Sequence, residues 1–211
     1  MRLAIIGAGE LGKLVAYHAA TDAGFEIAGY YDDFVKTESF NGKPVLGKCD
    51  QILADHKEKV FDQLFIGIGY DHMDVRSKYF EQFSGQIPFA NIIHSSSYID
   101  PSCKLGTGIF ILPGNVLDLE VTVEDNVLIN TGGTIAHHSK IGAHSFLAPA
   151  VQIAGLVMVA ERCFIGIGAT IVDCINVATG SVIGAGSVVL NDTEENSVSV
   201  GVPAKIVKYK N

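Results

Sequence analysis

The sequence has no tryptophan and little charge, since Asp, Glu, Lys and Arg make up only 18% of its residues. Basic residues are the scarcer kind, with 15 Lys and Arg against 23 Asp and Glu, which gives a net charge of −8. A chain with this balance has no general basic field to hold phosphate backbones. The composition therefore argues against nucleic acid as a partner.

Cysteine is scarce, and long apolar runs are missing. The four cysteines show no Cys-x-x-Cys spacing and are too few for a disulfide scaffold or a zinc site, so we expect reduced thiols. No apolar run reaches the length of a membrane span, and the apolar segment 3–6 lacks the basic flank and cleavage site of a signal peptide. These absences predict a cytoplasmic protein without a membrane span.

The sequence is rich in aliphatic residues and in glycine. Hydrophobic residues make up 48% of the 211 positions, and the 23 glycines follow no three-residue period. This composition excludes a disordered or collagen-like chain and leaves enough apolar side chains for a real core.

A six-residue repeat fills the second half of the chain. Every sixth residue from Ile99 to Val189 is Ile, Leu or Val, which makes sixteen consecutive anchors. The position four residues after an anchor is mostly small or β-branched. A hexad with one buried aliphatic and a tight turn is the unit of a parallel β-helix, in which three hexads form one coil of eighteen residues. The repeat predicts about five coils.

Residues 1–93 follow a different pattern, typical of a small Rossmann-like α/β domain with a parallel sheet. We expect strands at 3–6, 26–31, 63–68 and 89–93 and helices at 13–23 and 73–83. The segment is too short for the two halves of a full dinucleotide fold. We therefore predict two domains, 1–93 and 94–211, in which segment 198–210 caps the last coil.

A glycine turn lies between the first strand and the first helix. Gly7, Gly9 and Gly12 form a Gly-x-Gly-x-x-Gly motif, and Asp32 and Asp33 end the next strand about twenty residues later. Such glycines let backbone amides at a helix N-terminus approach a phosphate, and the carboxylates can accept hydrogen bonds from a ribose or a base. We favour a nucleotide or nucleotide-sugar site, with a dinucleotide site or a purely structural turn as alternatives.

Three histidines lie within eight residues of the repeat. His137 and His138 fall at a turn between hexads, where side chains point outwards. An imidazole there can serve as a general base, because it exchanges protons near neutral pH. Gly155 lies eighteen residues after His137 and should stack on it, with an open amide that can act as an oxyanion donor. A polar surface corner, or a metal site formed with His144, are the alternatives, and we predict no metal.

The repeat, His137 and two further segments together resemble a known family. These segments are Ile183-Gly-Ala-Gly-Ser-Val-Val189 and Gly201-Val-Pro-Ala-Lys205. They are similar to the hexapeptide-repeat acyltransferases, which fold as left-handed parallel β-helices and use acetyl-CoA. With the glycine turn and Tyr31-Asp32-Asp33 in front, the whole chain resembles the nucleotide-sugar N-acetyltransferases of the bacillosamine and perosamine pathways and the sialic-acid-cluster O-acetyltransferases.

The resemblance implies roles for individual residues. His137 takes the place of the general base, and His138 stands where an acidic residue usually orients that base. Relatives often carry a second histidine where this chain has Phe146, two residues after His144. The residues that the resemblance assigns to acetyl-CoA are Gly155, Ile167, Ala185 and Lys205. It also places the glycine turn against the diphosphate of a nucleotide sugar and Asp32 and Asp33 against its base or ribose.

These observations predict an acetyl-CoA-dependent N-acetyltransferase that acts on a nucleotide-linked amino sugar in surface glycan biosynthesis. Transfer is expected to be direct, since no cysteine lies beside His137 in its hexad to act as a nucleophile. Family members are usually trimers, and a flat prism face suits self-association. The alternatives are an O-acetyltransferase for a sugar or sialic acid hydroxyl and a non-catalytic trimeric scaffold.

Overall fold

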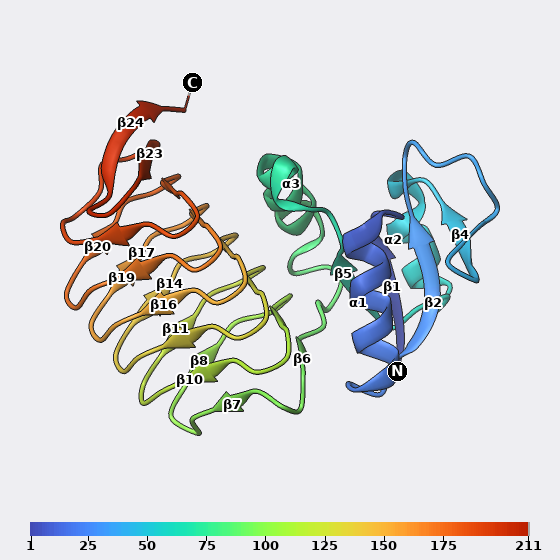
Figure 1. The fold of residues 1–211 in the computed structure, drawn as a ribbon. Coiled ribbons are helices and arrows are strands. Elements are labelled where there is room, and N and C mark those ends of the chain that lie inside the picture. Colours follow the sequence, from blue (N-terminus) through green and yellow to red (C-terminus); the bar gives the residue numbers. More distant parts are fainter. Residues whose placement is uncertain (211) are drawn as a thin grey trace. The chain divides into compact units, whose positions relative to one another are not determined.

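The computed structural model describes residues 1–210, and the chain divides into two compact units, Met1–Ile92 and Ile93–Asn211. The first unit is an α/β domain and the second is a β-helix (Figure 1). Within the described residues, no helix combines the length and the apolar character needed to cross a membrane.

The first unit is built on a five-stranded sheet with the order β3-β4-β2-β1-β5. Strands β1, β2, β4 and β5 run parallel, and β3 pairs antiparallel with β4. The strands are β1 (Arg2–Ile6), β2 (Glu26–Tyr31), β3 (Ser39–Phe40), β4 (Lys43–Gly47) and β5 (Gln63–Ile66). The helices are α1 (Glu10–Thr21), α2 (Ile52–Lys57) and α3 (Met73–Phe83), with short 3₁₀ turns η1 (Cys49–Gln51) and η2 (Tyr70–His72).

Most elements of this unit match the sequence prediction. Strand β2 and helix α3 have the expected bounds, whereas α1 starts three residues earlier than expected because Gly9 serves as its N-cap. The β3–β4 hairpin was not anticipated, although Asn41-Gly42 is a known hairpin signal and both residues have positive φ values, 48° and 72°. The expected strand at 89–93 is reduced to one bridge at Phe89 and the short strand β6 (Ile92–Ile93).

The second unit forms the left-handed parallel β-helix that the resemblance implies. From β7 to β19, each two-residue strand pairs in parallel with the strand eighteen residues later, so that Thr134 and Ile135 lie beside Gln152 and Ile153. The coil strands are β7 (Tyr98–Ile99), β8 (Lys104–Leu105), β9 (Phe110–Ile111), β10 (Val116–Leu117), β11 (Thr122–Val123), β12 (Leu128–Ile129), β13 (Thr134–Ile135), β14 (Lys140–Ile141), β15 (Phe146–Leu147), β16 (Gln152–Ile153), β17 (Met158–Val159), β18 (Phe164–Ile165), β19 (Thr170–Ile171), β20 (Asn176–Val177), β21 (Val182–Ile183) and β22 (Val188–Val189).

The anchors of the repeat fill the inside of this prism. From Ile111 to Val189 all are at most 2% exposed, and they belong to one continuous hydrophobic cluster. Burial of each such side chain contributes about 1.5–3 kcal/mol, and the coils share this core, so the stack is stabilised as a whole. The core therefore sets the eighteen-residue register that places side chains above one another at the corners.

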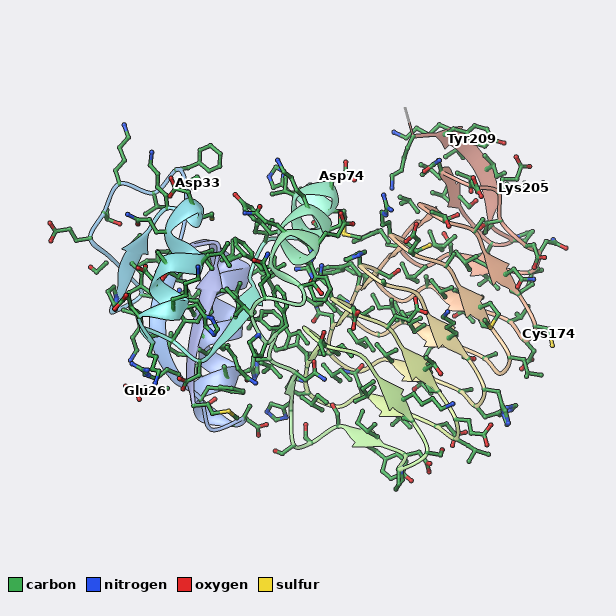
Figure 2. The ribbon with its side chains drawn as sticks, turned by 180° about the vertical axis from the view of Figure 1, so that it is seen from behind. Glu26, Asp33, Asp74, Cys174, Lys205 and Tyr209 are labelled. Atoms are coloured by element: carbon green, nitrogen blue, oxygen red, sulfur yellow. The ribbon has the colours of Figure 1, made fainter. Side chains whose placement is uncertain are left out.

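An antiparallel pair follows the last coil. Strand β23 (Ser197–Val200) pairs with β21, and β24 (Lys205–Tyr209) turns back along β23. Figure 2 shows Lys205 and Tyr209 on this terminal pair. The segment ends the repeat where the sequence pattern stops.

Candidate functional site

A cavity of about 500 Å³ opens beside the glycine turn of the first unit. Gly7, Gly9, Asp32 and Asp33 line it, as expected for ligand-binding residues. Gly12 does not line it, because a Cβ at this position would lie 2.0 Å from the carbonyl oxygen of Gly7. Gly12 therefore allows α1 to pack closely on the turn and, unlike Gly7 and Gly9, is not part of the cavity lining.

Asp32 holds the glycine turn in place. Its Oδ2 accepts a hydrogen bond from the Ala8 N–H at 2.9 Å, and its Oδ1 accepts from the N–H groups of Phe34 and Val35 at 2.9 and 3.1 Å. The carboxylate thus links the end of β2 to the turn after β1 by a hydrogen bond. This fixes the wall of the cavity before any ligand arrives.

Asp33 is anchored by two groups from other elements. The Cys49 N–H donates to Oδ1 at 2.9 Å, and the Tyr79 hydroxyl of α3 donates to Oδ2 at 2.7 Å. The bond from Tyr79, followed by that from Cys49, lowers the pKa of Asp33, which keeps the carboxylate charged. Burial raises the pKa of the Cys49 thiol to about 12, so this cysteine stays protonated and unreactive.

Sequence reasoning missed Cys49, His72 and Tyr79, which also line this cavity. They lie in η1, η2 and α3, the elements that follow β4 and β5. A signal was present, because the segments after the carboxyl ends of parallel strands meet at one edge of a sheet. The order of the strands, which the sequence did not reveal, decides which of these segments are neighbours.

The two adjacent histidines lie at one corner of the β-helix, directly after β13. The ring of His137 meets that of His138 nearly edge-on, with centroids 5.2 Å apart and an interplanar angle of 83°. Their Nδ1 atoms are 3.0 Å apart, which is a hydrogen-bond distance. The Nε2 edge of His137 is therefore not used by this contact.

Gly155 lies against His137 in the next coil, as the eighteen-residue spacing predicts. A Cβ at Gly155 would be 2.6 Å from Cε1 and 2.7 Å from Nε2 of the imidazole, so only glycine fits here. The Gly155 N–H, however, donates to Oδ1 of Asp173 at 3.0 Å. The expectation of an open oxyanion amide is wrong, because Asp173 stacks on Gly155 as Gly155 stacks on His137.

The other residues assigned to acetyl-CoA lie elsewhere on the prism. Ile167 and Ala185 are exposed and stack eighteen residues apart, two hexads beyond the corner of His137 and Gly155. Lys205 is exposed on β24. A single prism thus places His137 on one corner and Ile167 and Ala185, which are expected to bind acetyl-CoA, on another.

His144 belongs to a third corner and does not join His137. Its Nδ1 lies 3.0 Å from Nδ2 of Asn126, and the residue is only 8% exposed. Phe146 is also buried, and its ring stacks on Phe164 with centroids 5.7 Å apart. Across residues 1–210, no group of three or more His, Cys, Asp or Glu side chains is placed to hold a metal ion.

Known proteins resemble each unit and the whole chain. Residues 2–83 match the model of the PglD N-terminal domain. The structure of GDP-perosamine N-acetyltransferase from Caulobacter crescentus, in complex with CoA and GDP-perosamine, superposes with a TM-score of 0.89 at 29% identity, over 99% of this chain and 97% of that one. The acetyltransferase domain of PglB from Neisseria gonorrhoeae with acetyl coenzyme A gives 0.89 at 28% identity, over 98% of both chains. The chain thus resembles these acetyltransferases over nearly its full length, and its first unit matches the PglD N-terminal domain.

The chain also resembles curated acetyltransferases over part of its length. It is 34% identical to serine acetyltransferase of Escherichia coli K12 over 111 residues, which is 52% of this chain and 37% of that protein. It is also 34% identical to galactoside O-acetyltransferase of the same strain over 101 residues. The chain thus spans a third to a half of the length of these relatives.

Sequence reasoning missed two further residues at the histidine corner. Oε2 of Glu120 lies 3.3 Å from Nε2 of His138, and Asp173 accepts the Gly155 amide. Glu120 precedes His138 by eighteen residues, and Asp173 follows Gly155 by eighteen. The spacing that predicted the contact of Gly155 with His137 would have found both.

Proposed function

We propose that the protein is an acetyl-CoA-dependent N-acetyltransferase for a nucleotide-linked amino sugar, in surface glycan biosynthesis. The observation that carries the proposal is the corner at His137, where an outward imidazole leaves its Nε2 edge over a glycine. The likeness over nearly the full chain to a structure that holds CoA and GDP-perosamine supports both substrates. The cavity beside Asp32 and Asp33 supplies the second binding region.

His137 would act as the general base in a direct transfer. The amine nitrogen of the sugar attacks the thioester carbonyl and forms the new N–C bond, while Nε2 of His137 takes the proton that the amine loses. The C–S bond then breaks, and the proton passes to the departing sulfur to give free CoA. No covalent enzyme intermediate is proposed, because no cysteine lies beside His137 in its hexad to act as the nucleophile.

The first unit would hold the nucleotide. Gly9 caps α1, a helix of 12 residues whose first N–H groups have no partners inside the helix. These groups and the helix dipole favour a diphosphate at this point of the cavity. Asp32 and Asp33, already fixed by their own hydrogen bonds, would present their remaining lone pairs to the base or ribose.

Acetyl-CoA would lie between two copies of the chain in a homotrimer. One copy would supply the His137 and Gly155 corner, and its neighbour the corner with Ile167 and Ala185. The separation of these residues within a single prism supports this arrangement. A Lys205 side chain would then meet the CoA end of the groove.

An O-acetyltransferase is the second candidate. The 34% identity to galactoside O-acetyltransferase over 101 residues favours it. A hydroxyl is a weaker nucleophile than a neutral amine and needs more help from the base. The two candidates share His137 and differ in the acceptor atom.

Turnover of acetyl-CoA, followed as release of free thiol, tests the proposal. The acceptors are UDP-, GDP- and dTDP-linked 3-amino and 4-amino sugars and free sialic acid. We expect release with one amino sugar and a loss of about 10²–10⁴-fold in His137→Ala. Activity on hydroxyl acceptors alone would support the second candidate, and silence with every acceptor would contradict the proposal. Sedimentation equilibrium would test the trimer.

A further inference from the structure

Glu120 and His138 form a stacked pair beside the proposed base. Both have left-handed backbone conformations, with φ values of 55° and 58°, and they occupy the same corner position of successive coils. The His138 N–H donates to the carbonyl oxygen of Leu119 at 2.8 Å, so the backbone ladder fixes their register. Oε2 of Glu120 then lies 3.3 Å from Nε2 of His138, and Nδ1 of His138 lies 3.0 Å from Nδ1 of His137.

Figure 2 shows one member of this corner column, Cys174. Cys174, which lies two coils beyond His138 in the same column, points away from the prism at its edge. The side chains of His138 and Glu120 are likewise 43% and 60% exposed. An exposed ion pair of this kind adds little to stability, so stability alone gives no reason for the contact.

The three side chains together decide which nitrogen of His137 carries a proton. A carboxylate only accepts hydrogen bonds, so Nε2 of a neutral His138 must carry its hydrogen towards Glu120. The Nδ1 of His138 is then bare and only accepts, so Nδ1 of His137 must carry a hydrogen towards it. In neutral His137 this leaves Nε2 as the bare, basic nitrogen, on the edge that lies against Gly155.

We propose that Glu120 is a positioning residue, which acts through His138 to hold His137 in the tautomer whose Nε2 is bare. The inference rests on the proposed function, in which Nε2 takes the proton of the acceptor. Without the carboxylate, His138 can adopt either tautomer. When its Nδ1 carries the hydrogen, Nδ1 of His137 must be the bare nitrogen, and Nε2 is protonated and cannot act as a base.

The kinetic test replaces the carboxylate by a group that both donates and accepts. Glu120→Gln should lower kcat about tenfold and leave the KM values of both substrates within about twofold, because Glu120 does not touch either substrate. Glu161→Gln is the matched control, since Glu161 is also an exposed glutamate in an ion pair, 3.2 Å from Arg162. It should keep the activity of the parent protein. Equal kcat values for the two variants would overturn the proposal.

A rescue experiment distinguishes the relay from a general loss of charge. His138→Glu places a carboxylate directly beside His137, so adding Glu120→Gln to this variant should cost nothing. The double variant should come within about threefold of the parent kcat. If Glu120→Gln lowers kcat by the same factor in both backgrounds, Glu120 does not act through His138.

Nitrogen-15 spectra of the histidine rings test the tautomer without any substrate. In the parent protein the bare nitrogen of neutral His137, assigned with His137→Asn, should be Nε2. In Glu120→Gln its signals should show a mixture of the two tautomers. Identical spectra would overturn the relay even if the protein transferred acetyl groups, and a mixture would support it even if the acceptor class proved wrong.

Discussion

The two units of the chain prepare their binding residues in different ways. In the β-helix, the contacts among Glu120, His138, His137, Gly155 and Asp173 all connect neighbours in sequence or residues eighteen apart. In the α/β unit, Asp33 is held by Cys49 and Tyr79, which are 16 and 46 residues away. A repeat thus makes spatial neighbours readable from sequence, whereas an irregular domain brings them together through its topology.

Gly155→Ala tests the eighteen-residue contact in the β-helix, and it has the largest expected effect of the variants. The new Cβ would lie 2.6–2.7 Å from the His137 imidazole, which must move away. We expect acetyl transfer to fall by at least about 10²-fold, as for loss of the base itself. Thiol release measures the activity, and circular dichroism checks the fold.

Gly132→Ala is the matched control for this variant. Its added Cβ meets no atom within 4 Å, and its positive φ of 69° costs stability without touching the histidine corner. Ala150 adopts a similar conformation, with a φ of 59°, in the next coil. The control should melt at a slightly lower temperature and keep its activity, so a Gly155→Ala protein that stays active would contradict the packing argument.

Gly12→Ala tests the packing of α1 on the glycine turn in the α/β unit. A Cβ there would lie 2.0 Å from the Gly7 carbonyl oxygen, so α1 must shift from the glycine turn, at a cost of about 1–3 kcal/mol in the free energy of unfolding. Urea denaturation measures this loss. Gly9→Ala should lose less stability, because no atom lies within 4 Å of its Cβ and only the N-cap of α1 is weakened, yet it adds a methyl group to the cavity lining. Equal stability of the two variants would contradict this division of the motif, in which Gly12 serves helix packing and Gly9 lines the cavity.

The same contrast explains how much the sequence could predict. Periodicity located the β-helix, and the eighteen-residue offset placed Gly155 on His137. It did not show that Asp173 takes the Gly155 amide, because a spacing argument pairs positions and leaves the hydrogen bonds open. In the α/β unit the motif located the cavity. The packing role of Gly12 depends on how closely α1 approaches β1, and local patterns do not encode that distance.

Tyr79→Phe probes the α/β unit with the smallest expected effect, through the charge of Asp33. The Tyr79 hydroxyl is the largest cause that lowers the pKa of Asp33, so its removal should raise that pKa towards the ordinary value of an aspartate. A carboxyl whose pKa is lowered in the folded state adds stability above its unfolded pKa, and this contribution is lost as the pH falls through the folded value. Parent and variant should therefore differ most in stability above about pH 4, and this part of the difference should shrink below it.

Two measurements check this last expectation. Carboxyl carbon-13 shifts followed against pH report the Asp33 titration directly, and thermal melts at neutral and acidic pH report the linked stability. Tyr17→Phe is the matched control, because Tyr17 is exposed on α1 and does not line the cavity. If Asp33 titrates alike in the parent and in Tyr79→Phe, the bond from α3 does not anchor the carboxylate. Asp33 would then be held by the Cys49 N–H, without help from α3.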